Sequence, residues 1–253
     1  MHYKKILKYS LNLLKKMIKI NRLYTLFTFL QLLVLIKLSN QCDLPIKNNN
    51  EIFTGDATAY GGGNTWGFCG FKEKSFLYSN KIEVALNSVQ WNNSLNCGRC
   101  VNIYYENNPP IKALISDKCP ECKYGDLDLF LESYSIIIKK NPGREKIQWN
   151  FITCDEFIDG KIRFRIDYIN YYWLSINPEN FLCGIANLEI SFGNNWIQLE
   201  RNDNSMSGLY FNFNGYINTP FQLKITSINH EILITEKYYT IDHILSTNFQ
   251  FKC

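Results

Sequence analysis

The N-terminal region of the sequence lacks an apolar run long enough to cross a membrane as a helix. The run Leu23–Ile36 falls short of the roughly 20 residues that a membrane-spanning helix needs. A basic segment precedes this run and polar residues 39–41 follow it, which is typical of a secretory signal peptide. We therefore expect a signal peptide over residues 1–41 and a polar linker over residues 42–51.

An Ala-x-Ala cleavage motif is also missing, and the basic segment that precedes the apolar run is long. An uncleaved signal-anchor is therefore the alternative to a cleaved signal peptide. In both cases the rest of the chain is expected outside the cytosol. It is either secreted to the extracellular matrix or cell wall, or held at a membrane by one span with its domains outside.

Acidic residues are absent from residues 1–22, which contain seven Lys and Arg residues. The formal net charge of +4 therefore comes from this segment, and the remaining chain is near neutrality. This distribution argues against nucleic acid or another polyanion as the partner.

Cysteine is plentiful, and an exported chain of this size with so many cysteines is expected to form disulfide bonds. Two Cys-x-x-Cys pairs also have zinc-knuckle spacing, but such knuckles are mainly intracellular, so we expect no metal. We leave the pairing of the last two cysteines and of the first one open. The nine cysteines are Cys42, Cys69, Cys97, Cys100, Cys119, Cys122, Cys154, Cys183 and Cys253.

The sequence pattern predicts two β-rich domains. Between residues 52 and 156, short alternating segments separated by Asn, Gly, Pro and Ser are typical of barrel strands, with one helix expected over residues 130–141. Between residues 161 and 253, seven or eight strands recur without a helical period, which predicts a β-sandwich.

Two aspartates in "ISDKCPECKYGDLDLF" are candidates for chemistry. Asp117 ends one apolar strand, Asp128 lies in the next, and the loop between them holds two cysteines. Paired carboxylates across a groove serve glycosidic chemistry, in which one donates a proton and the other accepts one. Asp is equally common as a turn residue, so spacing alone favours a structural role for both.

The segments "GDATAYGGG", "WGFCGF", "CGRC", "ISDKCP", "GDLDLF" and "WNFITCD" follow one another in an order that resembles the expansins. The resemblance covers most of residues 52–155, and the second half is similar in layout to the expansin C-terminal module. The implied fold is mainly β: a six-stranded double-psi β-barrel, related to the family-45 endoglucanases, followed by an immunoglobulin-like β-sandwich.

The resemblance also implies functional residues. Thr58, Tyr60 and Asp117 would line the groove, and Asp128 would match the general acid of the related endoglucanases. The implied disulfide bonds are Cys69–Cys97, Cys100–Cys154 and Cys119–Cys122.

The sequence departs from the pattern at two functional positions. Asp126 and Leu127 replace the family's His-Phe before the Asp that matches Asp128, and Gly62 lies where the endoglucanases have their base. An inverting hydrolase needs a second carboxylate, so we expect no hydrolysis, although Asp56 and Asp117 are nearby acids.

A carbohydrate-binding surface is expected in "INYYWLSI". Strand alternation would place Tyr171 and Trp173 on one face, whereas the resemblance to bacterial expansins selects Tyr172 and Trp173 and would require a bulge. The alternative role for these rings is sheet packing. The family's third aromatic falls near Asn204, and Trp196 is expected in the core.

The expected function is non-hydrolytic loosening of cell-wall polysaccharides by a secreted protein that binds cellulose or another β-glucan. The alternatives are a weak inverting endoglucanase and a plain extracellular carbohydrate-binding protein. We expect a monomer that binds no cofactor, with a glycosylation sequon at Asn92.

Overall fold

The computed structural model describes residues 51–61, 67–71, 82–155, 158, 160–202 and 209–253. The predicted signal segment (1–41) and all but the last residue of the predicted linker (42–51) lie outside these ranges. Within the described ranges, no helix is both long enough and apolar enough to span a bilayer.

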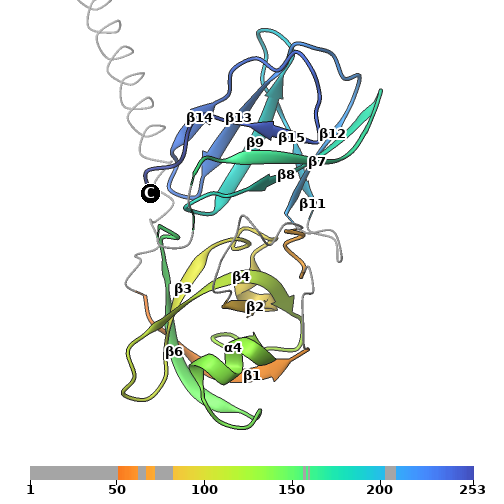
Figure 1. Cartoon of the computed structure of the whole chain (residues 1–253). Coiled ribbons are helices and arrows are strands. Elements are labelled where there is room, and N and C mark those ends of the chain that lie inside the picture. The colour runs from red at the N-terminus through yellow and green to blue at the C-terminus, as the bar shows by residue number, and fades with distance from the viewer. Residues whose placement is uncertain (1–50, 62–66, 72–81, 156–157, 159, 203–208) are drawn as a thin grey trace, which may run out of the picture. The chain divides into compact units, whose positions relative to one another are not determined.

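Six strands close into a barrel with the order β1-β5-β2-β4-β3-β6 (Figure 1). Strand pairs β1/β5 and β2/β4 are parallel and the other neighbours are antiparallel, so the barrel is mixed. The strands are β1 Phe53–Tyr60, β2 Glu83–Asn87, β3 Cys100–Tyr104, β4 Ile111–Cys119, β5 Leu127–Phe130 and β6 Glu145–Ile152.

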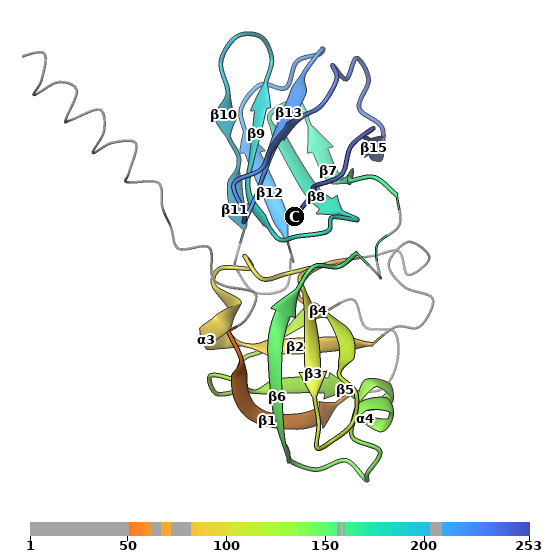
Figure 2. The ribbon, with the colours of Figure 1, turned by 90° about the vertical axis from the view of Figure 1, so that its left-hand side faces the viewer.

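In the described residues, helices α3 and α4 accompany the barrel, and both are labelled in Figure 2. Helix α4 spans Leu131–Ile137 and packs against β1 and β5. It is shorter than the predicted segment 130–141, because Lys139 adopts the left-handed conformation (φ 59°) that ends a helix. Helix α3, Ser88–Trp91, was not expected; the Asn87 side chain caps it by accepting a hydrogen bond from the Gln90 amide.

The C-terminal half contains a four-stranded sheet, β10-β9-β13-β14, and a five-stranded sheet, β11-β12-β8-β7-β15. The alternation in β13 is typical: Leu223 and Ile225 are fully buried, while Lys224 between them is not. The strands are β7 Arg163–Asn170, β8 Trp173–Glu179, β9 Ile185–Ser191, β10 Ile197–Gln198, β11 Glu200–Asn202, β12 Tyr210–Asn214, β13 Gln222–Ser227, β14 Ile232–Ile234 and β15 Ile244–Ser246.

The predicted fold class, a double-psi β-barrel followed by a β-sandwich, is confirmed. The barrel strands end at Ile152 and the sandwich strands begin at Arg163. We therefore propose domain bounds of 52–156 and 161–253.

Four disulfide bonds link the described cysteines, which agrees with the oxidation expected for an exported chain. Three join the pairs that the expansin resemblance implies, Cys69–Cys97, Cys100–Cys154 and Cys119–Cys122. The fourth, Cys183–Cys253, settles a pairing that the sequence left open.

Loop length should decide how much each bond contributes to stability. The Cys100–Cys154 bond spans 54 residues and the Cys119–Cys122 bond spans 3. On the chain-entropy estimate, replacing Cys100 and Cys154 with Ala lowers the free energy of unfolding by about 4 kcal/mol, and replacing Cys119 and Cys122 lowers it by about 2 kcal/mol. Urea denaturation of the two double variants measures both losses, and equal losses would contradict the estimate.

Candidate functional site

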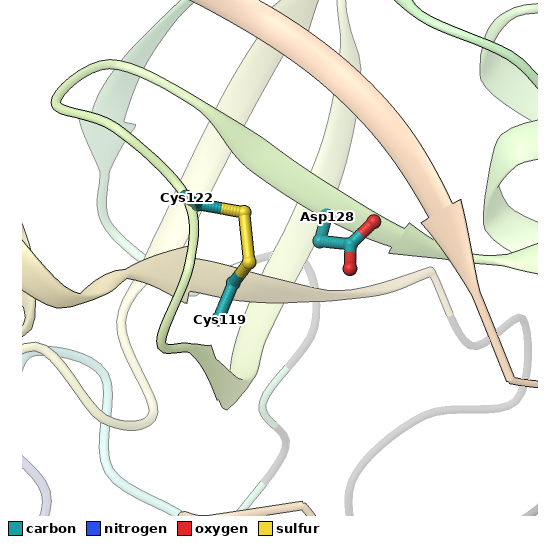
Figure 3. A group of neighbouring side chains, drawn as sticks. All are labelled: Cys119, Cys122 and Asp128. Atoms are coloured by element: carbon teal, nitrogen blue, oxygen red, sulfur yellow. A yellow bond between two sulfur atoms is a disulfide. The ribbon is translucent and has the colours of Figure 1, made fainter.

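A cleft of about 540 Å³ opens on the barrel beside the end of β1. Thr58 and Tyr60 from β1 and Asp128 from β5 line it, together with residues of the loop that joins β4 to β5. Figure 3 shows the Cys119–Cys122 disulfide of this loop beside the Asp128 side chain. The sequence-predicted residues Thr58, Tyr60 and Asp128 therefore share one cleft.

Asp128 is held in the cleft by its neighbour in the barrel. Parallel pairing sets Thr58 opposite Asp128, and the Thr58 hydroxyl donates a 2.5 Å hydrogen bond to Asp128 Oδ1. Only 8% of Asp128 is exposed. Burial raises the pKa of its carboxyl, and the nearby carboxylates of Glu121 and Asp117 act in the same direction, against the Thr58 hydrogen bond. Asp128 therefore keeps its proton to higher pH than an exposed aspartate does.

Asp117 has a different environment, although the sequence presents it as the partner of Asp128. Its Oδ2 accepts a 2.8 Å hydrogen bond from the Tyr60 hydroxyl, and its Oδ1 accepts from the amides of Phe68 (2.7 Å) and Lys118 (2.8 Å). Asp117 does not itself line the cleft among the described residues. It holds the Tyr60 side chain and the backbone at Phe68 in place.

Tyr60 presents a protonated phenol at the cleft. Burial, with the Asp117 carboxylate, raises the pKa of its hydroxyl, so this group remains a hydrogen-bond donor. Its ring packs against Phe130 with the centroids 4.6 Å apart. The position of the Tyr60 side chain is therefore fixed by Asp117 at its hydroxyl and by Phe130 at its ring.

The loop before Asp128 is anchored by Gly125 and Asp126. The Trp149 indole donates a 2.7 Å hydrogen bond to the Gly125 carbonyl, and Asp126 accepts from the amides of Asp56 (2.8 Å) and Lys123 (3.0 Å). Gly125 has φ +89°, and a Cβ there would lie 2.2 Å from the Thr54 carbonyl oxygen. Only glycine fits at this position.

Asp56, which the sequence offered as a substitute base, is committed to two cations. Lys146 Nζ lies 2.5 Å and Arg144 Nη1 2.9 Å from its carboxylate oxygens. These hydrogen bonds, that to Lys146 first, lower the pKa of Asp56, so it is a weaker base than an unpaired aspartate. Gly62, at the position of the family's base, lies outside the described residues.

The aromatic segment of the sandwich is a hairpin turn, which corrects the strand predicted there. Asn170 pairs with Trp173, so Tyr171 and Tyr172 form the turn between β7 and β8 and Trp173 begins β8. Strand alternation does not apply to turn residues. Tyr171 (78%) and Tyr172 (64%) are both exposed, and Trp173 is partly exposed, so the three rings need no bulge at this point.

A further tyrosine, missed in the sequence, joins this surface. The amides of Gly215 and Ile217 donate 3.0 Å hydrogen bonds to the carbonyls of Tyr172 and Tyr171, which brings the turn after β12 against the hairpin turn. Tyr216, 62% exposed, thereby lies with its ring centroid 6.0 Å from that of Tyr172. The Asn-Gly turn signal before Tyr216 was visible in the sequence, but nothing there indicated which turn it meets.

Three other residues were named in the sequence analysis. Trp196 is partly exposed beneath Lys224, whose Nζ lies 4.8 Å from the ring centroid, so the prediction of a core tryptophan is wrong. Asn92 is exposed, and its glycosylation stays a prediction. Asn204 lies outside the described residues.

Comparisons with known proteins agree with the fold and the motifs. No family model matches the chain. A curated relative, "Expansin-like protein 6" of Dictyostelium discoideum, is 24% identical over 180 residues; the aligned region is 65% of this chain and 59% of the relative.

Two solved structures of an expansin from Clavibacter michiganensis share the fold. The apo form has a TM-score of 0.68 at 21% identity and covers 79% of this chain and 98% of that one. An Asp-to-Asn mutant in complex with cellohexaose has a TM-score of 0.67 at 20% identity, with the same coverage. The resemblance to the expansin family, predicted from the motifs, is thereby confirmed.

The raised pKa of Asp128 predicts a pH-dependent effect of Asp128→Asn on stability. A carboxyl whose folded-state pKa lies above its unfolded value contributes stability below the unfolded pKa and loses it as pH rises through the folded pKa. The uncharged variant avoids this loss, so its stability relative to the parent should increase as pH rises from about 3.9, the ordinary value, through the folded-state pKa of Asp128. Urea denaturation of both proteins across this range tests the prediction, and a difference that does not change with pH would contradict it.

Proposed function

We propose that this chain is an exported, expansin-like protein that binds cellulose or another β-glucan and loosens contacts between polysaccharide chains without cutting them. The observation that carries the proposal is the burial, raised pKa and position of the Asp128 carboxyl. This carboxyl is buried, holds its proton to raised pH and lies in an open cleft. The other predicted acids, Asp56 and Asp117, are committed to cations and to hydrogen-bond donors.

The solved relative supports β-glucan as the ligand, because an expansin of the same fold was crystallised with cellohexaose. A flat glucan also suits the exposed aromatic surface of the sandwich. Tyr171, Tyr172, Trp173 and Tyr216 present rings that can stack on the apolar faces of sugar rings without enclosing the chain.

Loosening would use hydrogen bonding at the cleft. The protonated Asp128 carboxyl donates to a glucan oxygen, while Thr58 fixes the orientation of the carboxyl. The Tyr60 hydroxyl and exposed polar groups of the cleft add further contacts. Each contact replaces a hydrogen bond between two glucan chains, so that the chains can slip past each other.

Hydrolysis is the less favoured function. Inversion requires a second carboxylate that activates water across the glycosidic bond. Gly62 takes the place of the family's base, and an ion-paired Asp56 is a poor replacement. One observation still favours a weak endoglucanase, since a raised pKa is what a general acid requires.

We further propose that the protein acts as a monomer without a cofactor. It would be secreted to the wall or matrix, with anchoring at a membrane as the alternative. A plain carbohydrate-binding role is the remaining candidate, and it predicts binding with no mechanical effect.

Asp128→Ala, which removes the carboxyl and leaves no side-chain donor at this position, is expected to reduce wall creep, or the weakening of cellulose paper, about tenfold, the effect of one lost hydrogen bond of about 1.4 kcal/mol. In the parent, loosening should fall as pH rises through the pKa of Asp128, which lies above the ordinary value of about 3.9. Creep is measured against Glu132→Gln, an exposed acid on α4 outside the cleft, which should behave as the parent.

Reducing-end release on amorphous glucan, measured in parallel, separates the candidates. We expect none from either protein. Release that Asp128→Ala abolishes would establish the endoglucanase, and an absence of creep in a protein that still binds cellulose would establish the plain binding protein.

Tyr172→Ala and Tyr216→Ala are each expected to weaken cellulose binding about fivefold. We take the stacking of one ring at about 1 kcal/mol, the value typical of aromatic pairs. Tyr239→Ala is the matched control, because Tyr239 is also exposed (70%) and makes no ring contact with the hairpin turn in the described residues. Binding isotherms on insoluble cellulose give the three affinities, and equal losses at all three positions would refute the aromatic surface.

A further inference from the structure

The cleft contains a set of possible metal ligands, in which Asp128 is joined by two sulfur atoms that the proposed function does not use. The sulfur atoms of Cys119 and Cys122 and a carboxylate oxygen of Asp128 all lie within 4.8 Å of one another (Figure 3). All three residues line the cleft. The two sulfurs are joined in a disulfide, so in this state they are not available as thiolate ligands.

The three residues are positioned by contacts that do not involve the disulfide. Cys119 ends β4, where it pairs with Asn87 of β2, and the Ser88 hydroxyl donates to the Cys119 carbonyl (3.2 Å). On the other side of the loop, Asp126 accepts from the Lys123 amide. The backbone on both sides of the disulfide is therefore anchored, and opening the bond would leave the side chains next to one another.

Two thiolates and a carboxylate suit a thiophilic divalent cation. Zinc binds Cys sulfur at about 2.3 Å and carboxylate oxygen at about 2.0–2.2 Å, in a tetrahedron. Ligand atoms around such a metal lie about 3.5–3.8 Å apart. The three atoms already lie within 4.8 Å of one another, so small side-chain rotations of the reduced cysteines would be enough to reach these separations.

The surroundings favour a cation at this point. The carboxylates of Glu121 and Asp126 line the same cleft and add negative charge, whereas Lys123 and Arg144 oppose it. Thr58 donates to Asp128 Oδ1 and so orients the carboxyl, as the outer-shell partners of metal-binding carboxylates do.

We propose that the reduced chain binds one divalent cation of the zinc class through Cys119, Cys122 and Asp128, and that the disulfide closes this site. A phosphine supplies the two electrons. It takes the oxygen of one water molecule and becomes the phosphine oxide. The two hydrogens of that water go to the two sulfurs, so that both cysteines become thiols. The cation then forms two metal–sulfur bonds and one bond to an Asp128 oxygen. Both thiol protons pass to the buffer, together with the Asp128 proton at a pH where that carboxyl is protonated.

The test uses the full chain with Cys42→Ser, Cys183→Ser and Cys253→Ser. These changes remove the unassigned ninth cysteine and the disulfide of Cys253, which is exposed. The remaining disulfides, Cys69–Cys97 and Cys100–Cys154, are fully buried and should resist the phosphine. Alkylation and mass spectrometry check that only Cys119 and Cys122 become modified.

After removal of the phosphine, the reduced protein is titrated with Zn²⁺ against a chromophoric chelator and with Cd²⁺ by thiolate-to-metal absorption. We expect one cation per chain, release of both thiol protons together with any proton on Asp128, and no binding by the oxidised protein. Asp128→Asn should lower the affinity at least tenfold. Thr58→Val, which removes only the orienting hydroxyl, should lower it about 10–100-fold.

Several results would overturn the proposal. They are an absence of cation binding to the reduced chain, unfolding of the barrel on reduction, or equal affinity in Asp128→Asn. Equal binding by a Cys119→Ser, Cys122→Ser variant would also overturn it. The titration contains no glucan, so its failure leaves the proposed function intact, and failure of the creep assay leaves the cation site intact.

Discussion

The approach of β1 to the loop before β5 is the contact on which the candidate site depends. A Cβ on Gly55 would lie 2.2 Å from the Gly125 carbonyl carbon, and one on Gly125 would meet the Thr54 carbonyl oxygen at the same distance. Two glycines thus allow two backbones to touch, and Trp149 and Asp126 fix the contact with hydrogen bonds. Because β1 pairs in parallel with β5 directly after this contact, Thr58 comes opposite Asp128. A larger residue at either glycine would shift this register and separate the hydroxyl from the carboxyl.

Two aspartates of similar burial have opposite roles because their partners differ. Asp117 accepts hydrogen bonds from a phenol and two amides, so it holds other groups in position. Asp128 receives one hydroxyl hydrogen bond, and burial with the nearby acids Glu121 and Asp117 raises its pKa, while Thr58 and Arg144 act in the opposite direction. Burial alone would therefore not distinguish the two aspartates; the groups that surround each carboxyl do.

Much of the architecture could be predicted from the sequence, because strand alternation, turn residues and cysteine spacing are local signals. The motifs around Thr58, Tyr60 and Asp128 also identified the residues that meet in the cleft. The sequence did not indicate the close contact of the hairpin turn with the turn at Gly215, since two turns far apart in the chain leave no joint pattern. Tyr216 was missed for this reason. Trp196 was assigned to the core because its apolar character suggested burial, whereas Lys224 covers it at the surface.

The exposed tyrosines lie on two turns, and this location affects how the sequence of the surface can change among related chains. Residues in the middle of a strand are constrained by their neighbours on both sides, and a one-residue insertion there reverses every following side chain. Residues 171–172 and 215–217 lie at the ends of strands, where changes of length or side chain leave the sheet pairing intact. Related chains can therefore change the size and chemistry of these exposed rings while the same interior is preserved.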